Sequence, residues 1–166
     1  MPELNGIFRE FALAFIGRLD GASGEIAFPE RLRRSDLDGT LDSLRVVDEY
    51  LAELHKTRRR IGDDAWHKTV LWGGAYLGEV IRHETTNRFD WVDYNEYMPR
   101  HPKLQGIIPE RTVATCAFLV LPNDYMSLPL NKIARFIDEG PENNVHFFAR
   151  GDIAQANRIA RAHGGG

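Results

Sequence analysis

Residues 66–81 of this chain read WHKTVLWGGAYLGEVI. Apolar residues and glycines recur along two neighbouring faces of an α-helix in this stretch. One face carries Trp66, Val70, Gly73, Leu77 and Val80, and the other carries Leu71, Gly74, Gly78 and Ile81. A helix that is apolar around much of its circumference is buried on most sides. The sequence therefore predicts a central, buried helix, capped by Asp63 or Asp64 and ending near His83.

Three glycines lie inside this predicted helix, at positions 73, 74 and 78. Each glycine in a helix interior lowers the stability of the helix by roughly 1 kcal/mol relative to alanine. These losses need a compensating gain, and a residue without Cβ lets another backbone approach closely. We therefore expect a neighbouring helix or sheet to pack tightly against the glycine positions.

Two amphipathic helices precede the central one. In residues 2–19 the apolar stripe consists of Leu4, Phe8, Phe11, Phe15 and Leu19, and Asp20-Gly21 is the predicted stop. The second helix covers residues 40–59, with Thr40 as its expected N-cap. Its basic end, residues 56–60, suits the negative pole of the helix dipole, so this run needs no bound phosphate to explain it.

The second half of the chain contains the predicted strands. Residues 87–94 alternate in polarity and carry aromatic side chains, which indicates a strand with one solvated face. Residues 111–121 form a nearly continuous apolar run, which predicts a strand buried on both faces. A short strand is also predicted at residues 25–28, and residues 95–109, which contain three prolines, are predicted to be a loop.

Helices are predicted again at the C-terminal end, at residues 129–138, 141–148 and 152–161, the last of them capped by Asp152. Helices and strands together predict a single α+β domain over residues 1–163, followed by a flexible tail at 164–166. In this fold class, several helices pack around a small, mainly antiparallel sheet.

Composition narrows the range of functions. The chain has 166 residues, 43% of them hydrophobic, and a net charge of −3. Residues 61–110 hold 8 acidic and 5 basic residues, so they carry the negative surplus. The lack of a basic excess argues against nucleic-acid binding. We also expect no signal peptide, no membrane association and a cytoplasmic location.

Motifs for common catalytic chemistries are missing from the sequence. It contains no phosphate-binding loop, no Gly-x-Ser-x-Gly elbow and no Cys-x-x-Cys pair. Its single cysteine, Cys116, lies in an apolar run and is expected to be a small buried hydrophobe. We therefore predict no catalytic residue, no metal ligand and no cofactor.

One pair of side chains keeps an enzymatic alternative open. Glu79 and His83 lie four residues apart on the central helix, so both could face one ligand. A small hydrolase or a metal-dependent enzyme centred on this pair is the alternative function. The simpler interpretation is a hydrogen bond or an ion pair, because a metal needs further ligands.

The segment DWVDYNEY, residues 90–97, is the predicted binding site. Its candidate residues are Asp90, Trp91, Asp93, Tyr94, Glu96 and Tyr97. Aromatic side chains beside charged ones are typical of protein–protein hot spots. The alternatives are that the acids form a solvated strand face or an acid–base pair, and that the aromatic rings complete the core.

Two stretches resemble a group of small uncharacterised bacterial domains. These are SLRVVDEYL at residues 43–51 and GAYLGEV at residues 74–80, followed by Trp91. Similar small domains include immunity proteins, which neutralise secreted toxins of competing bacteria. The resemblance implies a non-enzymatic protein partner, such as a basic toxin domain, and carries over no catalytic residue.

The acids within these two stretches also have a structural interpretation. Asp48 lies three residues after Arg45, and Glu79 lies three residues before Arg82. We expect each acid to pair with its neighbouring arginine, because an unpaired buried charge is very costly. A third functional hypothesis is a domain that associates with itself as a homodimer.

Overall fold

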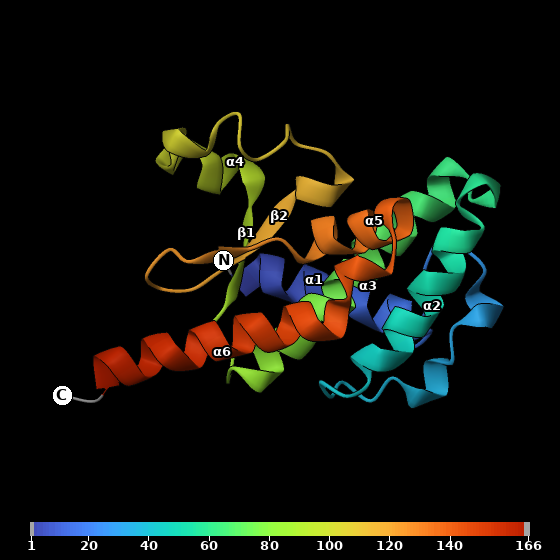
Figure 1. The fold of residues 1–166 in the computed structure, drawn as a ribbon, viewed down its shortest axis with the longest axis horizontal. Coiled ribbons are helices and arrows are strands. Elements are labelled where there is room, and N and C mark those ends of the chain that lie inside the picture. The colour runs from blue at the N-terminus through green and yellow to red at the C-terminus, as the bar shows by residue number, and fades with distance from the viewer. Residues whose placement is uncertain (1, 165–166) are drawn as a thin grey trace.

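The structure, a computed structural model, describes residues 2–164 (Figure 1). Its helices are α1 (Pro2–Phe15), α2 (Leu44–Lys56), α3 (Asp63–Glu84), α4 (Tyr94–Tyr97), α5 (Pro129–Glu139) and α6 (Val145–Gly164), and its strands are β1 (Asp90–Asp93), β2 (Ala117–Val120) and β3 (Met126–Ser127). The predicted α+β class is confirmed, because the helices pack with one small antiparallel sheet. The tail predicted at 164–166 starts on the last residue of α6, and residues 165 and 166 lie outside the described part.

Helix α3 is the central element, as the sequence predicts. Every residue from Trp72 to Gly78 is buried, and α3 packs against α1 on one side and α5 on another (Figure 1). The predicted cap is wrong, because Gly62 occupies the N-cap position and no side chain caps it. Asp63 and Asp64 lie in the first turn instead, where the positive end of the helix dipole stabilises their negative charges.

The glycines of α3 are contact points with other elements, which confirms the packing expected from them. A Cβ at Gly74 would lie 2.7 Å from the Cα of Leu130 in α5. A Cβ at Gly73 would lie 3.3 Å from the ring of Phe15 in α1, and one at Gly78 would overlap Trp91 of β1. Since Leu130 meets Gly74 with its backbone, the missing Cβ sets how closely α5 approaches α3.

The sheet has the order β1-β2-β3 and separates two hydrophobic clusters. Trp91 of β1 pairs with Leu119 of β2, and both belong to the main core with α1 and α3. The next pair, Val92 and Phe118, belongs to the second cluster. Both faces of β2 are therefore buried, as its apolar run predicts. The solvated face predicted for β1 is wrong, because Trp91 and Val92 are both buried, one in each cluster.

Both strands are shorter than predicted. The run at 111–121 forms a strand only over Ala117–Val120, and a 3-10 turn at Val113–Thr115 precedes it. This turn is held by a capping box in which the Thr112 and Thr115 hydroxyls each accept a backbone N–H. The hydroxyl groups thus give the backbone a local alternative to the sheet. The strand predicted at residues 25–28 is absent, and this part of the chain is irregular.

Helix α1 ends earlier than predicted. Gly17 has a positive φ of 74°, its N–H donates to the carbonyl of Ala14, and the N–H of Arg18 donates to that of Leu13. This bonding pattern is the Schellman motif, which ends a helix at a left-handed glycine. Gly17 therefore ends the helix, and the predicted stop at Asp20-Gly21 was wrong.

Helix α2 starts four residues later than predicted. The Thr40 hydroxyl accepts the N–H of Ser43 at 3.3 Å, so it closes a turn ahead of the helix. The Ser43 hydroxyl lies 2.6 Å from that of Tyr76 on α3. Ser43 thereby links the start of α2 to the central helix in place of capping α2.

The C-terminal helices differ most from prediction. One continuous helix, α6, replaces the two predicted at 141–148 and 152–161, and only a 3-10 turn occupies Pro141–Asn143. Asp152 is not an N-cap, because it lies buried in the middle of α6 and accepts hydrogen bonds from Tyr125 and Ser127. Within residues 2–164, no helix is long and apolar enough to cross a membrane.

Candidate functional site

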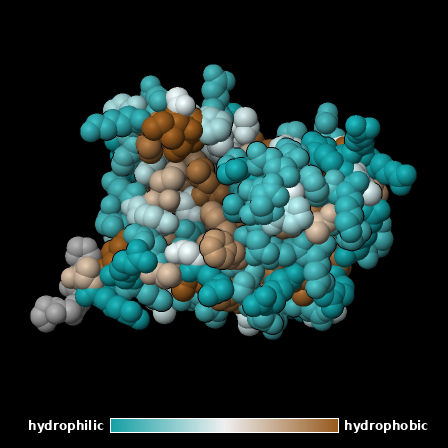
Figure 2. Space-filling model, in the orientation of Figure 1, coloured by the Kyte–Doolittle hydropathy of each residue, from teal (hydrophilic) through white to brown (hydrophobic). Residues whose placement is uncertain are grey.

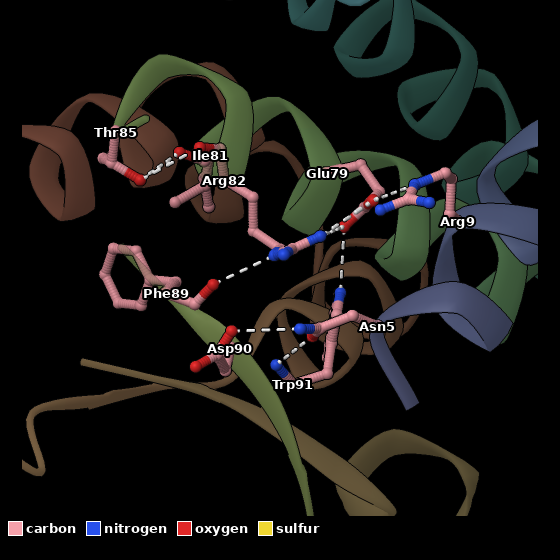
Figure 3. A network of polar contacts seen from close by, with 9 residues as sticks. All are labelled: Asn5, Arg9, Glu79, Ile81, Arg82, Thr85, Phe89, Asp90 and Trp91. Carbon is pink, nitrogen blue, oxygen red and sulfur yellow. Dashed lines mark hydrogen bonds and ion pairs between the residues drawn. The ribbon is translucent and has the colours of Figure 1, made fainter. Parts of the chain in front are cut away.

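A network of polar contacts joins α1, α3 and β1 around Glu79 (Figure 3). The two carboxylate oxygens of Glu79 each lie 3.2 Å from Nη1 of Arg82, and Oε2 also accepts the Trp91 indole N–H at 3.0 Å. Arg9 of α1 lies 3.9 Å from the same carboxylate. The pairing of Glu79 with Arg82 that the sequence predicts is confirmed.

Arg82 and Asn5 complete the network at β1 (Figure 3). The buried guanidinium of Arg82 donates through Nε to the carbonyl of Phe89 at 2.9 Å. The Asn5 side chain accepts the backbone N–H of Trp91 at 2.8 Å and donates to Asp90 at 3.0 Å. Asn5 therefore satisfies part of the free edge of β1, which lowers the tendency of that edge to pair with another chain.

These contacts weaken the enzymatic alternative at Glu79 and His83. Glu79 is engaged by Arg82 and Trp91, whereas His83 is exposed and forms no described bond with Glu79. Among the described residues, no group of three or more His, Cys, Asp and Glu side chains is placed to hold a metal ion.

A cleft of about 440 Å³ lies beside this network. Its walls come from α1, from the segment 37–40 and from α3. Glu79 and His83 both line it, together with Tyr76, whose hydroxyl accepts the N–H of Gly39 at 3.0 Å. This hydrogen bond fixes one wall of the cleft to the central helix. Sequence reasoning missed the cleft, because its walls come from separate parts of the chain.

The structure divides the predicted binding residues at β1 between surface and core. Asp90 is exposed and bonded to Asn5. Trp91 is fully buried and stacks on Phe8 of α1, with ring centroids 4.1 Å apart. Trp91 therefore completes the core, which was the alternative interpretation of the aromatic rings, and it is not available for a partner.

The rest of the predicted segment turns away from the sheet. Asp93 caps α4 by accepting the N–H of Asn95 at 2.8 Å and lies 3.5 Å from Arg111. Tyr94 is half-buried and Glu96 is exposed, whereas Tyr97 is buried at 2% exposure. Of the six predicted residues, Asp90 and Glu96 are thus the most accessible. The acids and aromatic rings do not form one continuous exposed surface.

The 94–116 insertion, which connects β1 to β2, has its own small core. Tyr97, Met98 and Ile108 of the insertion pack with Phe118 and Val120 of β2. A groove of about 480 Å³ runs along the insertion and is lined in part by Tyr94, Met98, Pro99 and Ile108. Ile107, beside this groove in sequence, is 75% exposed. Figure 2 shows hydrophobic side chains gathered at the upper left of the view, where Figure 1 places this insertion.

A further acid, the half-buried Asp48, serves the packing of α6. Asp48 of α2 accepts the backbone N–H groups of Val145 and His146 at 2.7 and 3.2 Å, so it caps the start of α6. The predicted pairing of Asp48 with Arg45 was wrong, because Arg45 bonds to Asp42 instead. Burial is the largest influence on Asp48 and raises its pKa despite the two N–H donors.

Cys116 and the basic run at residues 56–60 also have structural roles. Cys116 is half-buried, burial raises the pKa of its thiol, and its sulfur lies 3.5 Å from the carbonyl of Val113. A thiol in such surroundings is a poor nucleophile.

In the basic run, Arg58 pairs with Asp138 of α5 at 2.6 Å. This bond ties the end of α2 to α5, so the arginine has a structural partner.

No protein-family model, no curated protein and no solved structure matches this chain.

Proposed function

We propose that the protein is a non-enzymatic protein-binding domain and that its binding surface is the 94–116 insertion. The observation that supports this proposal is the exposure of Ile107, at 75%, between Gly106 and Ile108, which both line the groove along the insertion. Figure 2 shows hydrophobic surface gathered at this insertion, and contiguous exposed apolar surface commonly marks an interaction site. A loop held on a rigid scaffold is also a common place for binding residues.

The insertion holds its groove open without using Ile107. Tyr97 and Phe118 pack at 5.4 Å between ring centroids, and the Tyr97 hydroxyl donates to the carbonyl of Asp124 at 3.1 Å. These contacts fix the base of the insertion to β2 and to the turn before β3. Ile107 therefore has no part in the small core, and its exposure is consistent with a role outside the fold.

The partner that fits this surface offers an apolar pocket for Ile107 and basic groups for Glu96 and Glu110, which are both exposed. Arg100 and Lys103 lie on the same insertion, so the surface has mixed charge and the apolar contact provides most of the affinity. In the specific form implied by the sequence resemblance, the partner is a basic toxin domain and the protein is a cytoplasmic immunity protein.

The proposal is tested by site-specific photo-crosslinking in cells, with the crosslinking residue placed at position 107. The matched control places it at Phe147, which is 74% exposed on α6. Crosslinking from position 107 but not from 147 identifies a candidate partner, and products of neighbouring genes are the first to examine. Ile107→Asp should then weaken that partner's binding at least about tenfold, and Phe147→Asp should not.

Three outcomes count against the proposal. Equal crosslinking from positions 107 and 147 indicates nonspecific contact, and unchanged affinity of Ile107→Asp removes the insertion from the interface. If the only crosslinked product is a second copy of this chain, the homodimer hypothesis replaces the proposal of a different protein partner. Light scattering will then show the dimer. For the toxin form, the association rate should fall as salt concentration rises.

A further inference from the structure

The cleft beside the Glu79 network has the size and lining of a small-molecule site. Its volume, about 440 Å³, falls in the range of ligand pockets. Its apolar wall is formed by Ala12 of α1, Ile16 just after α1, Leu37, and Val80 of α3. Leu13, at the same wall, remains 36% exposed. An apolar molecule lying against Leu13 and Ile16 would cover surface that the fold leaves in contact with water.

Charged groups at the cleft are not all neutralised by one another. The carboxylate of Glu79 is already held by Arg82, and that of Asp38 accepts both the hydroxyl and the N–H of Thr40. These hydrogen bonds lower the pKa of Asp38, so it remains ionised at neutral pH. Three arginines therefore face two carboxylates, which leaves the cleft with a positive surplus.

The surplus lies at the rim, on Arg9 and Arg18. Arg18 is exposed and forms no ion pair among the described residues. Arg9 has a side chain that is 65% exposed and reaches Glu79 only at 3.9 Å. A guanidinium group binds a carboxylate through two parallel hydrogen bonds. The rim thus offers cationic groups to an anion whose apolar part lies on the wall below.

We propose that this cleft binds a small amphipathic monocarboxylate, with its apolar chain against Leu13 and Ile16, beside the buried side chains of Leu37 and Val80, and its carboxylate at Arg9 and Arg18. The apolar wall favours a ligand with a hydrocarbon chain, and the positive surplus favours a ligand with a negative charge. This site is separate from the 94–116 insertion, so the ligand proposal and the proposal of a protein partner can be tested independently.

Isothermal titration calorimetry with decanoate tests the proposal, and decanol and decyltrimethylammonium serve as the neutral and cationic probes. Decanoate should bind at one site and more tightly than the other two. Arg18→Gln should weaken decanoate binding at least about tenfold, because a charged hydrogen-bonding partner is lost. The matched control is Arg59→Gln, an exposed arginine outside the cleft, which should bind decanoate like the unaltered protein.

Amide chemical shifts locate the bound probe, since Ile16 and Val80 should shift on titration with decanoate. The proposal is overturned if decanoate does not bind, if decanol or the ammonium probe binds as tightly, or if Arg18→Gln leaves decanoate affinity unchanged. Because Arg18 is exposed, thermal melting of Arg18→Gln should match that of the unaltered protein, which separates lost binding from lost folding.

Discussion

The indole ring of Trp91 occupies the place that a side chain at Gly78 would need. A Cβ at Gly78 would lie 2.1 Å from Cζ2 of Trp91 and 2.6 Å from Cη2. The same indole stacks on Phe8 and donates its N–H to Glu79. This contact between α3 and β1, together with the pairing of β1 with β2, holds β1 in position. The 94–116 insertion begins where β1 ends, so the position of the proposed binding surface depends on this contact.

Glu79→Ala should lower the free energy of unfolding by about 3 kcal/mol, because it leaves the buried guanidinium of Arg82 without its carboxylate partner. His83→Ala is the matched control on the same helix. His83 is exposed, and its loss should change the free energy of unfolding by less than about 0.5 kcal/mol. Urea denaturation measures both. Equal effects of the two substitutions would show that the network does not stabilise the fold.

Asp48→Ala should lower the free energy of unfolding by about 0.5–2 kcal/mol, the usual range for losing a helix cap. The loss arises at Val145 and His146, whose N–H groups Asp48 accepts across 97 and 98 residues of chain. Asp42→Ala removes an exposed acid that pairs with Arg45 and should have a much smaller effect. Faster hydrogen exchange at the start of α6 in Asp48→Ala alone is the expected signature. A stability loss without that local change would contradict the capping role.

The raised pKa of Asp152 should be visible in how the free energy of unfolding depends on pH. Burial raises the pKa of this carboxyl, and the hydrogen bonds from Ser127 and Tyr125 only partly oppose the rise. The folded state therefore holds the proton more tightly than the unfolded chain, so protonation adds to the free energy of unfolding. This contribution is fully present below the ordinary pKa of 3.8 and is lost as pH rises through the raised value.

Asp152→Asn isolates this effect, since the amide keeps hydrogen-bonding capacity and does not titrate. As pH falls from 7 towards 4, the free energy of unfolding of the unaltered protein should rise relative to that of Asp152→Asn. Other titrating groups are common to both proteins and cancel in the difference. A difference that is constant with pH, or that has the opposite sign, would show that the pKa of Asp152 is not raised.

The sequence predicted the features that depend on local pattern. Its apolar periodicity identified α3 as buried, and its three glycines predicted close packing, which Leu130 and Trp91 provide. The ends of elements were less predictable, because competing local signals were present. Gly17 ends α1 before the Asp20-Gly21 signal is reached, since its left-handed conformation completes the helix-terminating bonds.

The features that were missed depend on residues distant in the sequence. Asp152 follows a glycine and therefore resembles an N-cap, but its partners are Tyr125 and Ser127 near β3. The aromatic residues of the predicted binding segment are equally consistent with core and surface in the sequence. Trp91 lies in the core because it packs on Phe8, which is more than 80 residues away in the sequence. The exposure of Ile107 likewise follows only from how the insertion folds.

The free energy of unfolding of Gly78→Ala, compared with that of Gly151→Ala, tests the central claim that α3 and β1 are in direct contact at Trp91. Gly151 lies exposed in α6, with nothing within 4 Å of a Cβ there. Gly78→Ala should lose about 2 kcal/mol or more through steric overlap, whereas Gly151→Ala should gain up to about 1 kcal/mol in helix propensity. If Gly78→Ala proves as stable as Gly151→Ala, Trp91 does not lie on the backbone of α3 and the arrangement described here is wrong.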